Sequence, residues 1–341
     1  MYMKSPAYPS VSLHNVTETV PAEWTEEGER LCRVPAAVGA ELNETARERV
    51  RCPTGSEIRF VPGSDDTDVE VTVSAAEETH VRVFWGVFQP WEPTEIGPEP
   101  ETLTLGVPDR LADLSPGTRA GRFDRRVCRI RFERRTGVAL HDVSGACRPP
   151  HERELPDTRY LAYGTSITEG AAASALHTDY VTHVARRLGY DALNLGCSGS
   201  AYCEEAMAEH VAGRDDWDVA TLGLSVNMAN TGGFAPETFR ERAETFVDTV
   251  AGAHPDTPVV CVTLFPYHDD LTAAGDAEHA AAYRTALREV AAASPHENLS
   301  VVDGPDLLDP TGLTADLLHP GDAGMSTIGD QLAERLDAVV E

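Results

Sequence analysis

Short runs of apolar and β-branched residues alternate with turn residues over the first 150 positions of the chain. In one run Val69, Val71 and Val73 alternate with polar residues, as expected for a strand with one buried face. The runs that we predict as strands are 57–61, 68–74, 79–88, 101–106, 127–132 and 138–143. A series of short strands separated by turns is typical of a β-sandwich.

The pattern changes after a polar segment at 147–159, which contains three prolines and is typical of a linker. Apolar strand candidates then alternate with amphipathic helical stretches, and one helix is predicted over 236–253, where Pro236 stands in the first turn. The predicted strands are 160–163, 192–195, 219–224, 259–265 and 299–302. This alternation predicts an α/β domain with a doubly wound parallel sheet. We therefore divide the chain into a β-sandwich domain at 1–150 and an α/β domain at 151–341.

The chain is strongly acidic. The chain of 341 residues has 56 acidic and 28 basic side chains, its formal net charge is -28, and Lys4 is its one lysine. Such a field repels nucleic acids and anionic membranes, so we expect neither as a partner. Dense carboxylates cost little where high salt shortens the Debye length, so the charge favours a halophilic origin. A GC-rich coding sequence would also remove lysine.

The first six residues show no secretory signal, and the sequence contains no stretch of about 18 apolar residues that could span a bilayer. We expect a soluble, cytoplasmic protein. The seven cysteines form no CxxC pair, so we predict buried free thiols and neither a zinc nor a redox site.

Functional residues of a doubly wound sheet gather in the loops that follow the carboxyl ends of the strands. After the first of these strands comes Gly164-Thr165-Ser166, and a serine in such a turn is exposed at the sheet edge, where a neighbouring base could activate it. Taken alone, the motif is explained better by a helix cap or an ordinary turn.

Two further loops carry groups that could stabilise an oxyanion. Gly199 follows the second strand, and a glycine lets backbone N–H groups approach a ligand closely. A phosphate-binding turn is the alternative, but the segment lacks the P-loop lysine and a complete GxGxxG. Asn227 follows the third strand and can donate through an uncharged amide. An Asx turn would explain this asparagine as well.

Near the C-terminus, Asp316 and His319 are three residues apart. At this spacing the carboxylate can fold back onto Nδ1–H of the imidazole and support the imidazolium that forms when Nε2 accepts a serine proton. A structural pair is the alternative. The position of the pair before the last predicted helix favours a catalytic role.

The four motifs, in this order and in these loops, resemble the SGNH/GDSL hydrolase superfamily. Residues 164–166 are similar to its first block, 198–199 to its second, 226–227 to its third and 316–319 to its fifth. The resemblance covers residues 153–341 and implies a flavodoxin-like five-stranded sheet.

The resemblance also implies a role for each motif residue. Ser166 would be the nucleophile, His319 the general base and then acid, and Asp316 the carboxylate that orients it. The oxyanion hole would consist of the N–H groups of Ser166 and Gly199 and the side-chain amide of Asn227. The family pattern implies no metal and no cofactor.

Two residues depart from the usual family blocks, namely Thr165 and Met228, where aspartates are usual. Similar variants resemble the branch that carries an N-terminal, jelly-roll-like β-sandwich and includes carbohydrate esterases. The implied activity is hydrolysis of small acyl esters, such as acetyl groups on sugars, through an acyl-enzyme. Acyl transfer by the same triad and a non-catalytic carbohydrate-binding protein are the alternatives. The oligomeric state stays open.

Two other clusters invite a functional interpretation. His268, Asp269 and Asp270 could bind a metal, but adjacent residues seldom converge on one ion, so we predict a solvated loop at the rim of the site. Trp85 and Trp91 could stack on a sugar, but we predict that both are buried in a core or an interface.

Overall fold

The computed structural model describes residues 7–115, 123–231 and 233–340. Residues 1–6, on which our prediction of a missing secretory signal rests, lie outside this range. The chain forms two compact units. Unit 1 comprises residues 1–36 and 50–157, and unit 2 comprises 37–49 and 158–341. The division differs from the predicted boundary at residue 150, and residues 37–49, which we assigned to the first domain, belong to the second.

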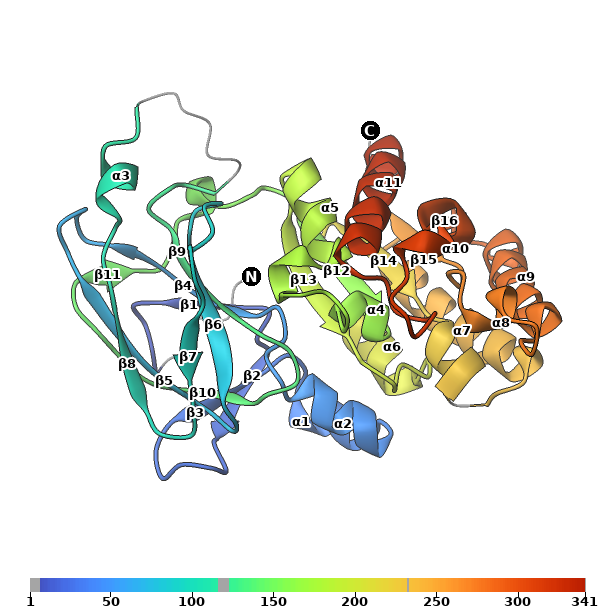
Figure 1. Ribbon diagram of the computed structural model, residues 1–341, viewed down its shortest axis with the longest axis horizontal. Helices are drawn as coiled ribbons and strands as arrows, with labels where there is room; N and C mark the ends of the chain where they lie inside the picture. Colours follow the sequence, from blue (N-terminus) through green and yellow to red (C-terminus); the bar gives the residue numbers. More distant parts are fainter. Residues whose placement is uncertain (1–6, 116–122, 232, 341) are drawn as a thin grey trace. The chain divides into compact units, whose positions relative to one another are not determined.

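Unit 1 contains two antiparallel sheets, as predicted (Figure 1). One has the order β1-β4-β9-β6-β7, with β11 paired to β4, and the other has the order β2-β3-β10-β5-β8. The strands are β1 (Ser12–His14), β2 (Glu18–Pro21), β3 (Glu29–Cys32), β4 (Glu57–Pro62), β5 (Val69–Ala75), β6 (Thr79–Trp85), β7 (Thr94–Ile96), β8 (Glu101–Leu105), β9 (Cys128–Phe132), β10 (Val138–Ser144) and β11 (Cys147–Arg148).

The core of unit 1 draws apolar side chains from both sheets, as a sandwich requires. Val69, Val71 and Val73 of β5 are fully buried, and Ile58 and Ile130 come from the other sheet. The alternating pattern therefore predicted the buried face of β5 correctly. Strands β1, β2, β3, β7 and β11 were missed because each has at most four residues, too few for an alternation to register.

A buried ion cluster lies in the first of these sheets. The side chain of Glu57 is 3% exposed, and its carboxylate lies 2.7 Å from Arg59 Nε, 2.6 Å from Arg129 Nη2 and 3.1 Å from Arg131 Nε. Burial alone would raise the pKa of Glu57, but Arg129 and Arg59 outweigh it and hold the pKa well below its usual value. The carboxylate is therefore charged in the folded protein.

Unit 2 is built on a parallel sheet with the strand order β13-β12-β14-β15-β16, which confirms the flavodoxin-like topology. The strands are β12 (Arg159–Gly164), β13 (Asp191–Gly196), β14 (Val219–Gly223), β15 (Val259–Val262) and β16 (Leu299–Val302). Helices cover both faces of the sheet, so β12, β14 and β15 are apolar almost throughout.

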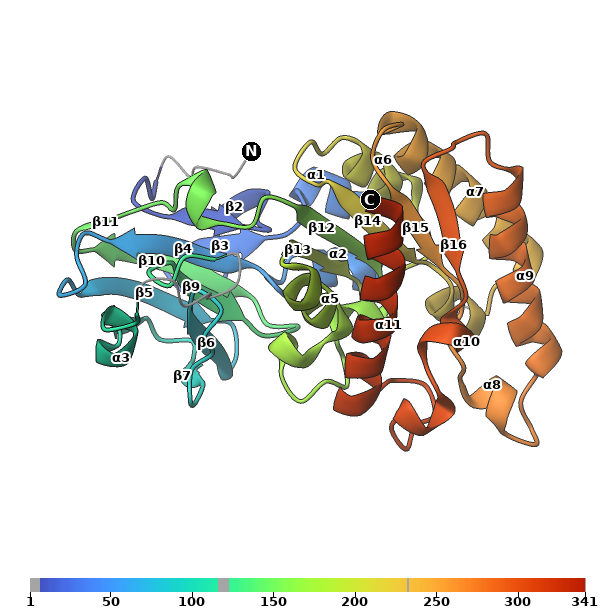
Figure 2. The ribbon, with the colours of Figure 1, turned by 90° about the horizontal axis from the view of Figure 1, so that it is seen from above.

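Figure 2 shows α5 (Tyr180–Leu188) and α11 (Asp322–Val340) on one face of this sheet. The other face carries α6 (Glu205–Ala212), α7 (Pro236–Ala253) and α9 (Ala277–Ala293), and α7 has the bounds that we predicted. Shorter helices are α1 (Ala36–Ala40), α2 (Glu44–Val50), α3 (Asp109–Ala112), α4 (Ser166–Glu169), α8 (His268–Leu271), α10 (Gly304–Leu307), three 3-10 turns (Glu152–Glu154, Leu176–Thr178, Pro310–Gly312) and a π-helix (Asn227–Thr231). Within the described residues, every helix is too short or too polar to cross a bilayer.

Candidate active site

Ser166 is the first residue of helix α4, directly after strand β12 and the capping residue Thr165. The Thr165 hydroxyl accepts a hydrogen bond from the N–H of Ile167, and Gly170 ends the helix in a left-handed conformation with a φ of 81°. This one-turn helix holds Ser166 at the carboxyl edge of the sheet, where the side chain is 4% exposed. The sequence left a helix cap and a nucleophile open as alternatives; the structure places a cap at Thr165, and the role of Ser166 as nucleophile remains a prediction.

The hydroxyl of Ser166 lies 2.8 Å from Nε2 of His319. On the other side of the ring, Nδ1 lies 2.6 Å from Oδ2 of Asp316. The structure therefore brings together the three residues that the sequence separates by about 150 positions. The order hydroxyl, imidazole, carboxylate is the arrangement that lets imidazole remove a proton from serine.

The loop that carries Asp316 and His319 is held by its own hydrogen bonds. Oδ1 of Asp316 accepts from the Thr314 hydroxyl at 2.7 Å and from the N–H groups of Leu318 and His319, each at 2.9 Å. Leu317 has a φ of 51°, and the N–H of Thr314 donates to the carbonyl of His319 at 2.8 Å. Because one oxygen is occupied by the loop, the other is directed to the imidazole.

This environment keeps Asp316 ionised. Partial burial raises the pKa of its carboxyl, but hydrogen bonds from His319, Thr314 and Leu318 outweigh burial and lower the pKa far below its ordinary value. A carboxylate that stays charged can keep the proton of His319 on Nδ1 and leave Nε2 free to accept one from Ser166.

The two predicted oxyanion donors lie on neighbouring loops. Gly199 has a φ of 72°, a conformation that favours glycine, and a side chain added there would meet open space. Oδ1 of Asn227 accepts from the N–H groups of Ser200 and Ala201, each at 3.1 Å. Since the amide oxygen is held by this loop, the donor Nδ2 is directed elsewhere. The role of Ser166, Gly199 and Asn227 as oxyanion donors remains a prediction.

A buried polar network next to helix α4, which carries Ser166, was not predicted. Asn194 donates from Nδ2 to the carbonyl of Thr168 at 2.7 Å and accepts from the N–H of Gly196 at 2.8 Å. Thr168, in turn, lies 2.8 Å from the hydroxyl of Tyr180. A side chain at Gly196 would collide with the backbone of Glu169, so α4 packs directly on β13. The signal for this network was present in the sequence as a polar residue inside the apolar run 192–195.

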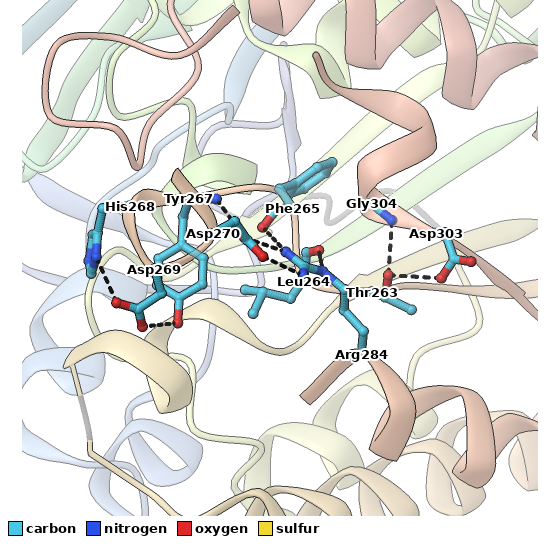
Figure 3. A network of polar contacts seen from close by, with 10 residues as sticks. All are labelled: Thr263, Leu264, Phe265, Tyr267, His268, Asp269, Asp270, Arg284, Asp303 and Gly304. Carbon is cyan, nitrogen blue, oxygen red and sulfur yellow. Dashed lines mark hydrogen bonds and ion pairs between the residues drawn. The ribbon is translucent and has the colours of Figure 1, made fainter. Parts of the chain in front are cut away.

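The segment around Asp270 is not the solvated loop that we predicted. Figure 3 shows a network in which the guanidinium of Arg284 contacts both carboxylate oxygens of Asp270, each at 2.7 Å. The same guanidinium donates to the carbonyls of Leu264 and Phe265 at 2.8 and 3.1 Å. Arg284 is 9% exposed and comes from the next helix, α9, and the adjacent acidic residues alone gave no sign that its long side chain would reach them.

The remaining residues of that cluster also have partners. The Tyr267 hydroxyl donates to Asp269 at 2.6 Å, and His268 Nε2 lies 3.0 Å from Oδ1 of Asn230. Among the described residues, no group of three or more His, Cys, Asp or Glu side chains has a geometry that could hold a metal.

The two tryptophans have different environments. Trp85 is 6% exposed and packs edge to face on Phe60, which confirms its predicted burial. Trp91 is 97% exposed, so the prediction that it is buried was wrong. Trp91 lies in the loop after β6, near two prolines. Because a loop has no strand alternation, the sequence does not indicate whether its side chain faces the core. All seven cysteines are free and all except Cys147 are buried, as predicted.

The model of the GDSL-like lipase/acylhydrolase family matches residues 162–326, which include the predicted triad and both loops of the predicted oxyanion hole. This region belongs to that family. The match confirms the resemblance that the four motifs suggested and supports an ester hydrolase of the SGNH/GDSL type. A search of curated protein sequences found no match to the hydrolase.

Several solved structures share the fold of both units. Salicylyl-acyltransferase SsfX3 from a tetracycline biosynthetic pathway has a TM-score of 0.77 at 15% identity, over 98% of this chain and 96% of that chain. A family two carbohydrate esterase from Cellvibrio japonicus has a TM-score of 0.65 at 12% identity, over 97% and 95%. A family two carbohydrate esterase from Clostridium thermocellum, in complex with cellohexaose, has a TM-score of 0.62 at 15% identity, over 84% and 93%. At these identities the likeness concerns the fold.

Proposed function

We propose that this hydrolase is a serine esterase that cleaves small acyl esters, with acetyl esters of carbohydrates as the leading substrate class. The observation that carries the proposal is the pair of short contacts from Ser166 through His319 to Asp316, at 2.8 and 2.6 Å. The structures of family two carbohydrate esterases, one with a bound oligosaccharide, support the choice of carbohydrate esters.

The chemistry follows from the geometry in two steps. Oγ of Ser166 attacks the ester carbonyl while Nε2 of His319 accepts its proton, and Asp316 stabilises the imidazolium. The negative charge on the carbonyl oxygen is met by the N–H groups of Ser166 and Gly199 and by the amide of Asn227. His319 then protonates the departing alcohol. Water, activated by the same imidazole, hydrolyses the acyl-enzyme.

Turnover of p-nitrophenyl acetate in molar salt tests the nucleophile. Ser166→Ala should lower kcat by at least about 10³-fold, because the hydroxyl that forms the acyl-enzyme is lost. Ser294→Ala is the matched control. Ser294 follows α9 just before the chain returns to β16, at the opposite edge of the sheet, and should retain wild-type activity. Equal turnover by the wild type and Ser166→Ala would reject the triad. Turnover by the wild type no faster than in buffer alone would favour a non-catalytic, carbohydrate-binding role.

Acyl transfer is the second candidate, and the likeness to an acyltransferase over nearly the whole chain favours testing it. In this reaction a hydroxyl acceptor replaces water in the second step, and the triad is unchanged. Partition of a labelled acetyl group between water and added polyols distinguishes the two. Acetylated polyol that accumulates faster than acetate would replace the hydrolase proposal with a transferase.

A further inference from the structure

The segment 37–49 contains most of helices α1 and α2. It belongs to unit 2, although more than 100 residues separate it in the sequence from the rest of that unit, which begins at residue 158. Its residue Asn43 contacts the loop between Gly199 and Glu204, which follows β13. We infer that Asn43 is a positioning residue that holds this loop, and with it the oxyanion donors, in place. The inference rests on the proposed function.

The loop needs external support because of its backbone conformation. Gly199 and Cys203 have φ values of 72° and 53°, and the left-handed conformation is unfavourable for a residue such as cysteine. A loop with such a residue keeps its shape only when contacts with the surrounding structure impose it.

Asn43 supplies one of these contacts. Its Nδ2 donates to the carbonyl of Ser200 at 2.9 Å and to Oε1 of Glu204 at 2.5 Å. The other carboxylate oxygen of Glu204 accepts from the N–H of Tyr202 at 3.2 Å. Asn43 is thus bonded to the loop directly at Ser200 and through Glu204 at Tyr202.

The same residue of the loop, Ser200, connects Asn43 to the predicted oxyanion hole. Ser200 accepts from Asn43 through its carbonyl, and its N–H donates to Oδ1 of Asn227 at 3.1 Å. The hydroxyl of Tyr202 donates to the carbonyl of Gly199 at 3.2 Å. A shift of Ser200 would therefore move the N–H donor that holds the amide oxygen of Asn227, and also the neighbouring Gly199.

A second clamp holds the loop from helix α7. Arg242 donates to the carbonyl of Tyr202 at 3.1 Å, and its guanidinium lies 4.9 Å from the ring centre of Phe234. The ring of Tyr202 packs on the same phenylalanine at 5.3 Å. Arg242 binds the loop at the Tyr202 carbonyl, whereas Asn43 binds it at the Ser200 carbonyl. The contact with Arg242 therefore does not replace the contact with Asn43.

The amide oxygen and the amide nitrogen of Asn43 have different partners. Oδ1 accepts from the N–H of Ala46 at 3.0 Å and so caps helix α2, while Nδ2 reaches the loop. A serine caps helices about as well as asparagine, but its side chain is too short to bring a donor to the Ser200 carbonyl. The main-chain N–H of residue 43, which lies 3.3 Å from Oε1 of Glu204, is kept in the variant. The two roles can therefore be separated by substitution.

Three variants test the inference with p-nitrophenyl acetate. Asn43→Ser keeps the cap and should lower kcat by about tenfold or more while KM changes less than about twofold, because misplaced oxyanion donors affect the transition state more than the bound ester. Asn43→Asp keeps the cap but sets a carboxylate against Glu204, so its kcat should fall further. Thr45→Ala, at an exposed position of α2, is the control and should match the wild type.

Inhibition by methylboronic acid supplies a readout that a merely structural role would not change. Its boron accepts an electron pair from Oγ of Ser166 as the serine proton passes to His319, no group departs, and the tetrahedral adduct resembles the transition state. The inhibition constant should rise with the loss of kcat in Asn43→Ser. A kcat and an inhibition constant equal to those of the wild type would overturn the inference, and so would an equal loss in Thr45→Ala.

Amide hydrogen exchange makes the test independent of turnover. Peptides that span residues 197–204 should exchange faster in Asn43→Ser than in the wild type, whichever ester the protein cleaves, because the N–H groups of Ser200 and Ala201 would be bonded less firmly to Asn227. Unchanged exchange would refute the positioning role even if the wild type lacked esterase activity. Lack of activity in the wild type would instead reject the proposed function.

Discussion

The contacts of Asp316 lead to a sharp expectation for the variant Asp316→Asn. Oδ1 accepts three hydrogen bonds from its own loop, so the amide oxygen of the new asparagine takes that position. The amide nitrogen then faces Nδ1 of His319 at the place where an oxygen now lies at 2.6 Å. Two donors cannot share this contact. The imidazole would therefore carry its proton on Nε2, where it cannot accept one from Ser166.

The size of the effect follows from this change of tautomer and from exposure. The same substitution in a buried serine protease triad costs about 10⁴-fold in kcat. Here the side chain of Asp316 is 48% exposed, so water can partly replace the lost charge. We expect a loss of about 10²- to 10³-fold in kcat, equivalent to about 3–4 kcal/mol in the activation free energy.

The assay is the steady-state hydrolysis of p-nitrophenyl acetate, with kcat and KM determined separately. Asp309→Asn is the control because Asp309 lies seven residues earlier in the chain and its carboxylate accepts from the N–H and the hydroxyl of Thr311, not from the imidazole. It should retain activity within about twofold, as for a surface substitution away from the site. If Asp316→Asn also stayed within this range, the tautomer argument would be refuted.

Three further predictions concern stability. Glu57→Gln should destabilise unit 1 by about 3–5 kcal/mol, because Arg59, Arg129 and Arg131 would surround an uncharged amide, and urea unfolding followed by tryptophan fluorescence should show it; a loss under about 1 kcal/mol would contradict the role of the cluster. Since the folded pKa of Glu57 is lowered, its contribution is complete above the ordinary carboxyl pKa of about 4.5 and declines as the pH falls toward the folded value. The difference between wild type and variant should therefore be constant near neutral pH and shrink only in acid; a constant difference at all pH values would disprove the linkage. The net charge of -28 predicts that the melting temperature rises from 0.1 to about 3 M KCl, and a flat or falling curve would argue against adaptation to high salt.

The sequence was informative where a local pattern determines the structure. Strand β12, helix α7 and the loops with Ser166 and His319 follow from apolar periodicity and from the rule that parallel strands end at one edge. The sequence did not predict contacts that depend on how separate elements pack. Nothing near Asn43 indicates that its amide reaches Ser200, 157 residues later, and nothing near Asp270 indicates its pairing with Arg284 on the next helix. Such contacts depend on the packed fold and leave no periodic signal.

The placement of residues 37–49 in unit 2 has a consequence for biosynthesis. During translation this segment emerges before every strand of the parallel sheet whose unit it joins, and the flanking residues on both sides belong to the sandwich. Domains generally fold as they leave the ribosome, N-terminal part first. Here unit 1 can fold before residues 158–341 have been made, and until then residues 37–49 lack the rest of the unit to which they belong. A fragment that starts at residue 158 would lack Asn43, so the hydrolase cannot be cut at its linker without loss of a piece of its catalytic half.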